Sequence, residues 1–195
     1  MPTTRATDTS ARIVCAAEDI VIRDGVSKLT IEAAAQEAGI SKGGVLYHFP
    51  SRAELVSAMV RRFVVSFDAD LETFGALGGK PGDFTLAYLR ATITPTSDAD
   101  DIRERRLGGA LLAGVASDPE LLAPLRDRFS SWQAAVEADG LGGDIATIVR
   151  LTADGLWLGD LFELAPVTGE LRRAVGKRLE SLVEEATRQG DERRS

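Results

Sequence analysis

The chain has 195 residues, of which 44% are hydrophobic, and a formal net charge of −7 at neutral pH. This length and composition suit a globular protein with one large domain or two small ones. No stretch approaches the roughly 20 uninterrupted apolar residues of a membrane span, and residues 1–12 lack the apolar core of a signal peptide. We therefore expect a cytoplasmic protein.

The charge is unevenly distributed along the chain. Residues 1–52 carry six basic and six acidic side chains, so the acidic excess lies in the remainder. A negative chain argues mildly against non-specific adhesion to nucleic acid. Cys15, the single cysteine, cannot form an internal disulfide and lies in an apolar run, which favours a buried small hydrophobe.

Apolar residues recur at spacings of three and four along almost the whole chain, and this pattern predicts an all-α fold. Caps and breakers mark the boundaries of the first helices. These helices are expected at about residues 9–24, 31–38 and 42–49, with ends set by Gly25, Thr30, Gly39, Ser41 and Pro50.

A longer helix is expected to follow, capped by Ser51 with Glu54 in a capping box and extending to Phe74. The segment GALGGKPGD, residues 75–83, is too rich in glycine to continue a helix and is the best candidate for a domain junction. Further helices are expected near residues 84–94, 99–116, 118–139, 143–164 and 168–189.

The stretch from Ile31 to Phe49 has the spacing of a helix-turn-helix. Ala35 is small enough for the two helices to approach closely, and Val45 supplies an apolar side chain between them. Gly39 takes the positive φ that the tight turn requires. The small core of this motif is expected to be completed by Ala34, Ala38, Ile40 and Phe49.

The helix 42–49 offers side chains that suit DNA. Ser41, Lys42, Tyr47 and His48 supply a hydroxyl, a cation, a phenol and an imidazole, which can bind phosphates or base edges. The helix N-terminus adds free backbone N–H groups and the positive end of the helix dipole.

Two adjacent glycines, Gly43 and Gly44, lie in the first turn of this helix, where each costs roughly 1 kcal/mol of helix stability relative to alanine. We interpret them as positions where the helix backbone comes close to a groove wall. This interpretation predicts that Gly44→Leu folds but loses affinity for DNA.

The spacing alone leaves other interpretations open. Helical hairpins with a glycine turn are common, and Lys42 and Arg52 can be ordinary solvated charges. Tyr47 can belong partly to the core, and His48 can merely cover Pro50.

The run TIEAAAQEAGISKGGVLYHFPSRAELVSAMV, residues 30–60, closely resembles the N-terminal signature of the TetR family of transcriptional regulators. Its most specific part is GISKGGVLYHFPSRAEL, with a glycine, a small cap, a short helix ending in tyrosine, one variable residue, a phenylalanine and a basic residue three further on. The resemblance covers about residues 10–60. The rest of the chain resembles the family only in being all-helical, acidic and of suitable length.

The resemblance implies a homodimer that binds a palindromic operator in double-stranded DNA, most often a repressor released by a small-molecule effector. Thr30 and Tyr47 would bind phosphates, and Arg52, where the family often has lysine, would anchor another. Base readout would rely on Lys42, His48 and DNA shape, because the glycine pair leaves few side chains. The implied DNA-binding residues are Thr30, Ser41, Lys42, Gly43, Gly44, Tyr47, His48 and Arg52.

The resemblance also implies separate domains for DNA binding and for effector binding and dimerisation. A helix-turn-helix DNA-binding domain is expected over residues 1–52, a connecting helix over about 51–74, and an effector-binding and dimerisation domain over 53–195. In the family, the effector shifts the connecting helix and thereby the separation of the two DNA-reading heads. Met59, Phe63 and Phe67 could transmit this shift, or could simply pack.

The acidic body holds aromatic residues that could enclose a largely apolar effector pocket, although an ordinary core explains each of them as well. The candidate pocket residues are Phe63, Phe84, Tyr88, Leu112, Phe129, Trp132 and Trp157.

The run 145–162 is apolar around most of its circumference, so a helix there must be covered on more than one side. Small residues on it and an apolar stripe on the last helix predict a four-helix bundle between two subunits. The candidate dimer residues are Gly155, Gly159, Leu171, Val175, Leu179 and Leu182.

An enzyme is the competing class. The single histidine excludes a His-rich metal site, and Cys15 lacks a positioned base. The glycine-rich segment lacks P-loop spacing and has Pro81 where Ser or Thr would hold Mg²⁺, and the acidic run 98–101 suits a helix N-terminus better than a cation site. We expect no catalysis, cofactor or metal. A third possibility is a helical ligand-binding or partner-binding protein that does not read DNA.

Overall fold

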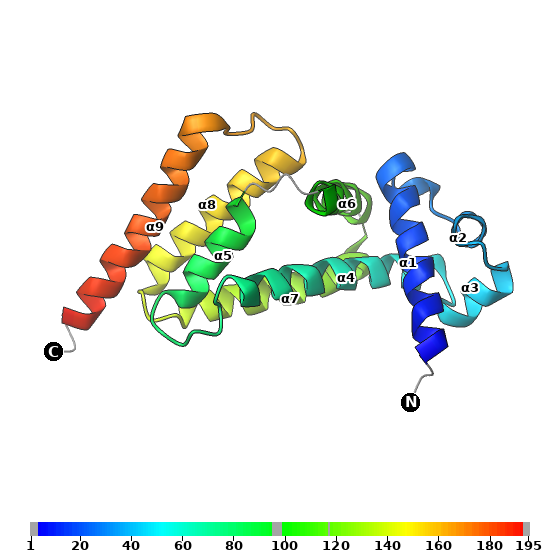
Figure 1. Cartoon of the computed structure of the whole chain (residues 1–195), viewed down its shortest axis with the longest axis horizontal. Helices are drawn as coiled ribbons and strands as arrows, with labels where there is room; N and C mark the ends of the chain where they lie inside the picture. Colours follow the sequence, from blue (N-terminus) through cyan, green and yellow to red (C-terminus); the bar gives the residue numbers. More distant parts are fainter. Residues whose placement is uncertain (1–3, 95–98, 117, 193–195) are drawn as a thin grey trace. The chain divides into compact units, whose positions relative to one another are not determined.

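The computed structural model describes residues 4–94, 99–116 and 118–192, and these form nine α-helices, one short 3-10 helix and no strand (Figure 1). The all-α prediction is confirmed. The elements are α1 (Thr4–Asp24), η1 (Val26–Lys28), α2 (Ile31–Ala38), α3 (Lys42–His48), α4 (Arg52–Thr73), α5 (Asp83–Ile93), α6 (Ala99–Val115), α7 (Pro119–Glu137), α8 (Gly143–Leu161) and α9 (Gly169–Glu192).

Most predicted helix boundaries lie within three residues of the observed ones, and the exception is the start of α1. This helix begins at Thr4 rather than near Thr9. Residues 4–8 contain a single apolar side chain, Ala6, so the periodicity that marks a helix in the sequence is missing there.

The chain divides into two compact units. The first unit comprises residues 1–64 and 97–126, and the second comprises residues 65–96 and 127–195. The helices α4 and α7 each contribute residues to both. The glycine-rich segment 75–83 lies inside the second unit as the loop from α4 to α5, so it is not the junction between units.

The core of the first unit is built on the apolar face of α1, whose residues Ile13, Ala16, Ala17, Ile20 and Val21 are buried. Helix α6 also packs against α1 and η1. A Cβ atom on Gly114 of α6 would lie 2.4 Å from the Cβ of Val26, so only glycine permits this approach of α6 to η1.

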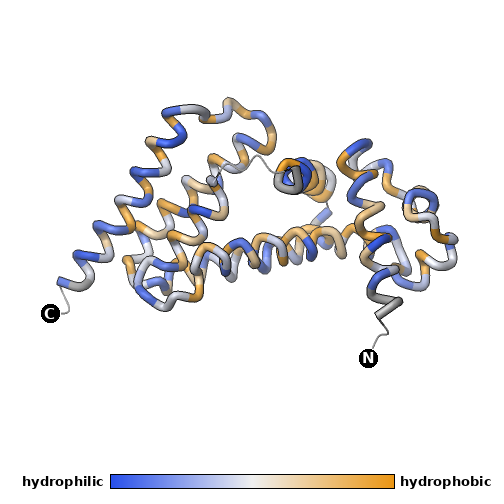
Figure 2. The backbone as a smooth tube through the Cα atoms, viewed as in Figure 1, coloured by the Kyte–Doolittle hydropathy of each residue, from blue (hydrophilic) through white to orange (hydrophobic). Residues whose placement is uncertain are grey.

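The core of the second unit lies between α5, α8 and α9. Figure 2 shows α9 as mainly hydrophilic with hydrophobic residues at intervals, as expected for a helix with one buried face. The buried side chains of this core include Ala87, Leu89, Ala146, Val149, Ala153, Leu179 and Val183.

The N-terminus of α5 is capped from a distant part of the chain. Asp139, after α7, accepts hydrogen bonds from the backbone N–H of Phe84 at 3.2 Å and of Thr85 at 2.8 Å. Its carboxylate also accepts from the hydroxyl of Thr85 at 2.6 Å, and Thr85 is 1% exposed. A buried hydroxyl and two free helix N–H groups are thereby satisfied by one side chain.

Candidate nucleic-acid interface and effector region

The turn between α2 and α3 has the geometry of a helix-turn-helix. The Thr30 hydroxyl accepts a hydrogen bond from Ala33 N at 3.0 Å and caps α2. Gly39 adopts a left-handed conformation, with φ 64°, and the next amide, Ile40 N, donates to Ala35 O at 2.9 Å. The predicted cap and the predicted glycine turn are confirmed.

Helix α3 is short and is fixed from both ends. The Ser41 hydroxyl accepts from Gly44 N at 3.1 Å and caps its start, and the backbone becomes extended at Phe49, just before Pro50. Val45 is fully buried and Ala35 is 5% exposed, which confirms their predicted packing roles. Ala34 and Phe49 also belong to this core, whereas Ala38 and Ile40 are only half-buried.

The two adjacent glycines of α3 have different surroundings. A Cβ atom on Gly44 would lie 2.7 Å from Cγ2 of Ile40 and 3.3 Å from the Ser41 hydroxyl oxygen. The same atom on Gly43 would meet nothing within 4 Å. The Gly44→Leu variant therefore requires the branched side chain of Ile40 to shift, so a cost in stability is expected beside the predicted loss of DNA affinity. That this variant folds stays a prediction. The fold does not require glycine at position 43.

The polar face of α3 contains a prominent aromatic side chain. Tyr47 is 82% exposed, and its ring meets that of His48 edge to face, with the centroids 5.2 Å apart. Ser41 and Lys42 are exposed at the other end of the helix, and His48 is half-buried. The alternative that Tyr47 is part of the core is thus excluded, and its phenol is accessible to a partner.

Lys42 is paired with an acidic residue that the sequence analysis did not single out. Its ammonium group donates to the carboxylate of Glu32, in the first turn of α2. The pKa of Glu32 is lowered, mainly because Lys42 donates this hydrogen bond to its carboxylate. An acid in the first turn of a helix is ordinarily explained by the helix dipole, so its sequence position did not distinguish it.

Arg52 holds the turn that precedes α2. Its guanidinium donates to Leu29 O at 2.8 Å and to Val26 O at 2.7 Å. Arg52 therefore links the start of α4 to the turn before α2, whereas the implied phosphate contact stays a prediction.

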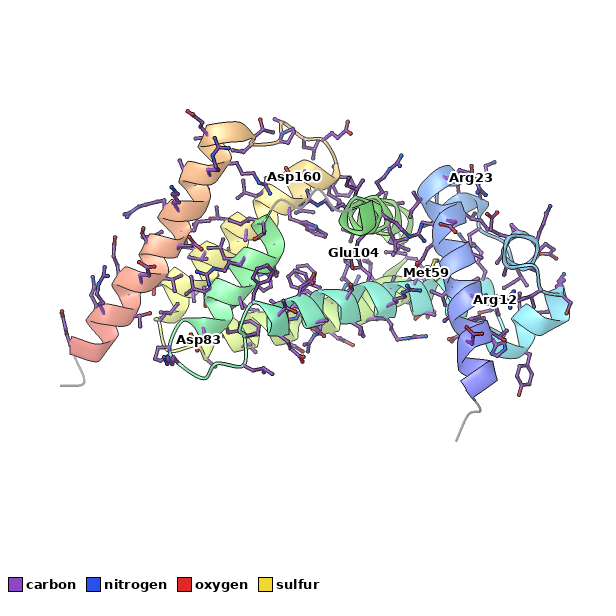
Figure 3. All side chains as sticks on the ribbon, in the orientation of Figure 1. Arg12, Arg23, Met59, Asp83, Glu104 and Asp160 are labelled. Carbon is purple, nitrogen blue, oxygen red and sulfur yellow. The ribbon has the colours of Figure 1, made fainter. Side chains whose placement is uncertain are left out.

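Two further arginines tie α1 to α2 (Figure 3). Arg12 donates to Ala38 O, at the C-terminal end of α2, at 3.0 Å, and Arg23 forms an ion pair with Glu37 at 3.2 Å. Helix α2 is thus held against α1 at its C-terminal half, which leaves its N-terminal turn beside α3.

Aromatic rings gather in the second unit. Trp132 of α7 meets Phe67, Tyr88 and Phe129 with ring centroids 4.8, 6.0 and 5.0 Å away. The indole N–H of Trp132 donates to Asp68 at 2.9 Å, and Arg128 forms an ion pair with the same carboxylate at 2.7 Å. We call Phe67, Tyr88, Phe129 and Trp132 the aromatic cluster.

A buried polar network adjoins the aromatic cluster through Tyr88. The Tyr88 hydroxyl donates to Asp154 at 2.7 Å, and Arg150 donates to the other oxygen of that carboxylate at 2.6 Å. Burial raises the pKa of Asp154, although Tyr88 and Arg150 act in the opposite direction. Burial, followed by the charge of Asp154, also raises the pKa of Tyr88. Arg150 continues the network to Gln133 at 2.5 Å.

Comparisons with known proteins agree with this architecture. The family model described as "Bacterial regulatory proteins, tetR family" matches residues 13–59, and the model described as "Tetracyclin repressor-like, C-terminal domain" matches residues 82–184. The chain belongs to the TetR family. The resemblance seen in the helix-turn-helix is thereby confirmed, and the TetR-family assignment extends to the C-terminal helices.

One curated TetR-type relative is the HTH-type transcriptional regulator TtgR from Pseudomonas putida, which is 38% identical over 55 residues. The match covers 28% of this chain, and the chain spans about a quarter, 26%, of the length of that relative. The similarity therefore reaches one segment of the relative and not its whole length.

Solved TetR-family structures share the fold over almost the whole chain. A regulator from Rhodococcus sp. has a TM-score of 0.71 and 18% identity, covering 92% of this chain and 99% of its own. A transcriptional regulator from Saccharomonospora viridis, in complex with choline, has a TM-score of 0.68 and 19% identity, covering 91% and 96%. At these identities the likeness concerns the fold.

The candidate pocket residues of this TetR-family chain do not all belong to one unit. Phe63 and Leu112 lie in the first unit and are half-buried. In the second unit, Tyr88, Phe129 and Trp132 come together in the aromatic cluster, which Phe67 completes. The remaining two candidates of the second unit, Phe84 and Trp157, are half-buried on α5 and α8.

Helices α8 and α9 present apolar residues at their surface. Ile148, Leu151 and Leu158 of α8 are 52, 55 and 40% exposed, on the same face as Gly155. On α9, Leu171 is 64% exposed, whereas Leu179 is 5% exposed and packs inside its own chain. The other candidate dimer residues, Gly159, Val175 and Leu182, are half-buried.

A buried acid connects three helices of the first unit. Glu18 of α1 is 3% exposed and lies 3.6 Å from Arg62 of α4 and 3.4 Å from Arg103 of α6. Burial raises the pKa of Glu18, although the charges of the two arginines act to lower it. Arg62 also donates to the sulfur of Cys15 at 3.0 Å, and Cys15 is half-buried rather than fully buried as predicted.

Within residues 4–94, 99–116 and 118–192, no group of three or more His, Cys, Asp and Glu side chains could hold a metal ion. None of the helices in these ranges is long and apolar enough to cross a membrane. The side chains of the acidic run 98–101 lie outside the described residues.

Proposed function

We propose that this TetR-family chain is a ligand-responsive repressor that binds a palindromic operator as a dimer in the cytoplasm and is released by a small molecule. The observation that carries the proposal is the surface of α3: a capped helix whose Tyr47 is 82% exposed. A large aromatic side chain this exposed at the end of a polar helix face indicates a partner, and a phenol suits a phosphate.

The residues proposed to contact DNA on this surface differ in the contacts that they already make within the chain. Lys42, Gly43, Tyr47 and His48 are proposed to face DNA directly. Thr30 and Ser41 cap their helices and can still donate a hydroxyl hydrogen to a phosphate. Gly44 acts by shaping α3 against Ile40, and Arg52 acts mainly by holding the turn before α2.

The experiment is selection of bound fragments from random DNA with the purified chain, followed by fluorescence anisotropy with the selected operator. Tyr47→Ala is expected to weaken binding about tenfold for every sequence, because one phosphate contact is lost. Leu77→Ala, at a side chain 80% exposed in the second unit, is the matched control and is expected to bind as the original chain does. Unchanged binding by Tyr47→Ala would contradict the proposed interface.

Dimerisation is proposed through the exposed apolar face of α8 together with α9. Ile148, Leu151, Leu158 and Leu171 would be covered by a second copy, and Gly155 would permit close helix approach. Leu151→Glu is expected to give a monomer in analytical ultracentrifugation at micromolar concentration, while Leu77→Glu is not. A monomeric unmodified chain under these conditions would remove the claim.

The effector region is proposed at the aromatic cluster of the second unit, for a ligand that is largely apolar. The network of Tyr88, Asp154 and Arg150 would orient its polar groups. A structural neighbour crystallised with a small organic molecule, choline, supports a ligand-binding role for this fold. Candidate compounds are tested by dissociation of the selected operator and by quenching of the tryptophan fluorescence.

The division of the chain into a DNA-binding part, residues 1–52, and an effector and dimerisation part, residues 53–195, is also proposed. Helix α4 would connect them, with Met59 and Phe67 as transmitters along it. Phe63 would act with them.

The alternative function is a helical ligand-binding or partner-binding protein that does not read DNA. The net charge of −7 argues mildly for it, and recovery of no bound fragment in the selection would favour it.

A further inference from the structure

The surface at the start of α3 contains a pair of opposite charges. Glu32 of α2 and Lys42 of α3 form an ion pair across the helix-turn-helix, with side chains 62 and 57% exposed. Gly43 and Gly44 next to them carry no side chain, and the Ser41 hydroxyl accepts the Gly44 N–H. Lys42 and Glu32 thus present the charged groups at the N-terminal turn of α3.

The pair contributes little to the stability of the fold. Water and salt screen an exposed ion pair, and the dipole of α2 adds only a modest stabilisation of the acid in its first turn. For a protein that binds DNA, an acid at this place also has a cost, since its charge repels phosphates and weakens binding to every sequence. A carboxylate in such a position is understandable if it discriminates between sequences.

The chemistry of the pair matches a G·C pair better than an A·T pair, whose amino donor lies between two acceptors, adenine N7 and thymine O4. An ammonium group donates hydrogen bonds and a carboxylate accepts them, side by side. In the major groove a G·C pair shows guanine N7 and O6 as acceptors beside the N4 amino donor of cytosine. Lysine is suited to guanine, and glutamate accepts from cytosine N4.

We propose that Glu32 is a specificity-determining residue of the DNA interface, which with Lys42 reads one G·C pair in each half-site. Lys42 donates to guanine and Glu32 accepts from cytosine N4. This inference rests on the proposed function, in which α3 enters the major groove. Glu32 acts in two ways, since it holds Lys42 in position and repels base edges that offer only acceptors to it.

The absence of a side chain at Gly43 supports this assignment. A Cβ atom there would meet nothing within 4 Å of the chain, so the fold leaves the space beside Lys42 open. A base edge can therefore approach the pair without displacing another side chain.

The test compares base preferences of the full chain and of the Glu32→Gln variant. Binding is measured to the selected operator, to operators with each base pair of the half-site changed in turn, and to random-sequence DNA. Glu32→Gln is expected to lose about tenfold discrimination at one position per half-site. It is also expected to bind random DNA about fivefold more tightly, because one repulsive charge is removed.

A matched control lies on the same helix. Glu37→Gln makes the same change of charge at an acid that pairs with Arg23, at 3.2 Å, and should leave the preference at every position intact. Lys42→Gln should relax the same position as Glu32→Gln, and the double variant should relax it no further. If the two single variants relaxed the preference at different positions of the half-site, and their effects added in the double variant, the two residues would not read one base pair together.

The outcomes separate this inference from the proposed function. Unchanged preference at all positions in Glu32→Gln, or an equal change in Glu37→Gln, overturns the role of Glu32 while operator binding by the original chain stands. If the original chain selects no operator at all, both the proposed function and this inference are overturned. A relaxed position that is G·C in the selected operator supports the assignment.

Discussion

In the α2–α3 motif, polar side chains bond to backbone groups three residues away, as Thr30 does with Ala33 and Ser41 with Gly44. In the second unit they reach across the chain: Asp139 binds Thr85 at a separation of 54 residues, and Tyr88 binds Asp154 at a separation of 66. The helix ends of the motif are thus set by its own sequence, whereas the polar groups of the second unit depend on how several helices are arranged.

This difference matches the two proposed tasks. A DNA-reading surface benefits from a rigid shape that its own caps maintain, because binding then requires little ordering. A network such as Tyr88, Asp154 and Arg150 is satisfied only while its helices keep their places. A ligand that rearranges those helices changes the network, so the second unit is the part suited to respond.

The largest effect is expected at the centre of the aromatic cluster. Trp132→Ala should destabilise the chain by about 3–5 kcal/mol, because a buried indole is lost and the carboxylate of Asp68 loses a donor. Urea unfolding followed by circular dichroism measures this. Phe74→Ala, at a side chain 36% exposed, serves as the control and should cost less than about 1 kcal/mol.

The long-range cap of α5 should give the next largest effect. Asp139→Ala is expected to cost about 2 kcal/mol, since it leaves the buried Thr85 hydroxyl and the first N–H groups of α5 without an acceptor. The exposed Asp144, in the first turn of α8, provides a comparison by Asp144→Ala. Equal losses of unfolding free energy in the two variants would show that the cap does not matter.

The two glycines of α3 should respond in opposite directions. Gly44→Ala should destabilise the first unit by about 1 kcal/mol or more, because its Cβ meets Ile40. Gly43→Ala should stabilise it by up to about 1 kcal/mol, since alanine favours a helix and nothing obstructs it. Thermal unfolding measures both. Loss of operator affinity in the stabilised Gly43→Ala variant would locate the close approach to DNA at that residue.

The smallest effect concerns the buried Glu18. Its raised pKa means that the native state holds the proton more tightly than the unfolded chain. Stability from this group is therefore present at low pH and falls as pH rises above the ordinary value of 4.5, with a slope of at most about 1.4 kcal/mol per pH unit. Glu18→Gln should remove that part of the slope in urea unfolding between pH 4 and 7.

A parallel pH dependence in the original chain and in Glu18→Gln would contradict this expectation.

The helices and the DNA-reading motif could be predicted from the sequence because their signals are local. Thr30, Gly39 and Ser41 set helix ends through hydrogen bonds and φ angles within a few residues, and the apolar period marks each buried face. The family signature lies in this same segment, which is why the reading motif and the family were recognised together.

Other features depended on side chains that meet only after folding. The sequence places Lys42 ten residues from Glu32 and Asp139 more than fifty from Thr85, and no periodicity joins either pair. The same holds for Leu179, which shares a stripe with Leu171 but faces its own chain. The unit to which α6 belongs also followed from packing, through Gly114 against Val26.

By itself, the sequence determined that the chain is all-α, where most of its helices begin and end to within three residues, and that residues 31–49 form a helix-turn-helix of TetR type. The tertiary structure alone decided which of two identical neighbours, Gly43 and Gly44, packs closely against the rest of the fold and which is open to a partner. The physical reason is that the sequence shows only that a glycine has no side chain, and not which atoms lie where that side chain would be. The atoms that would occupy the missing space come from other residues, here Ile40, and their positions are set by folding.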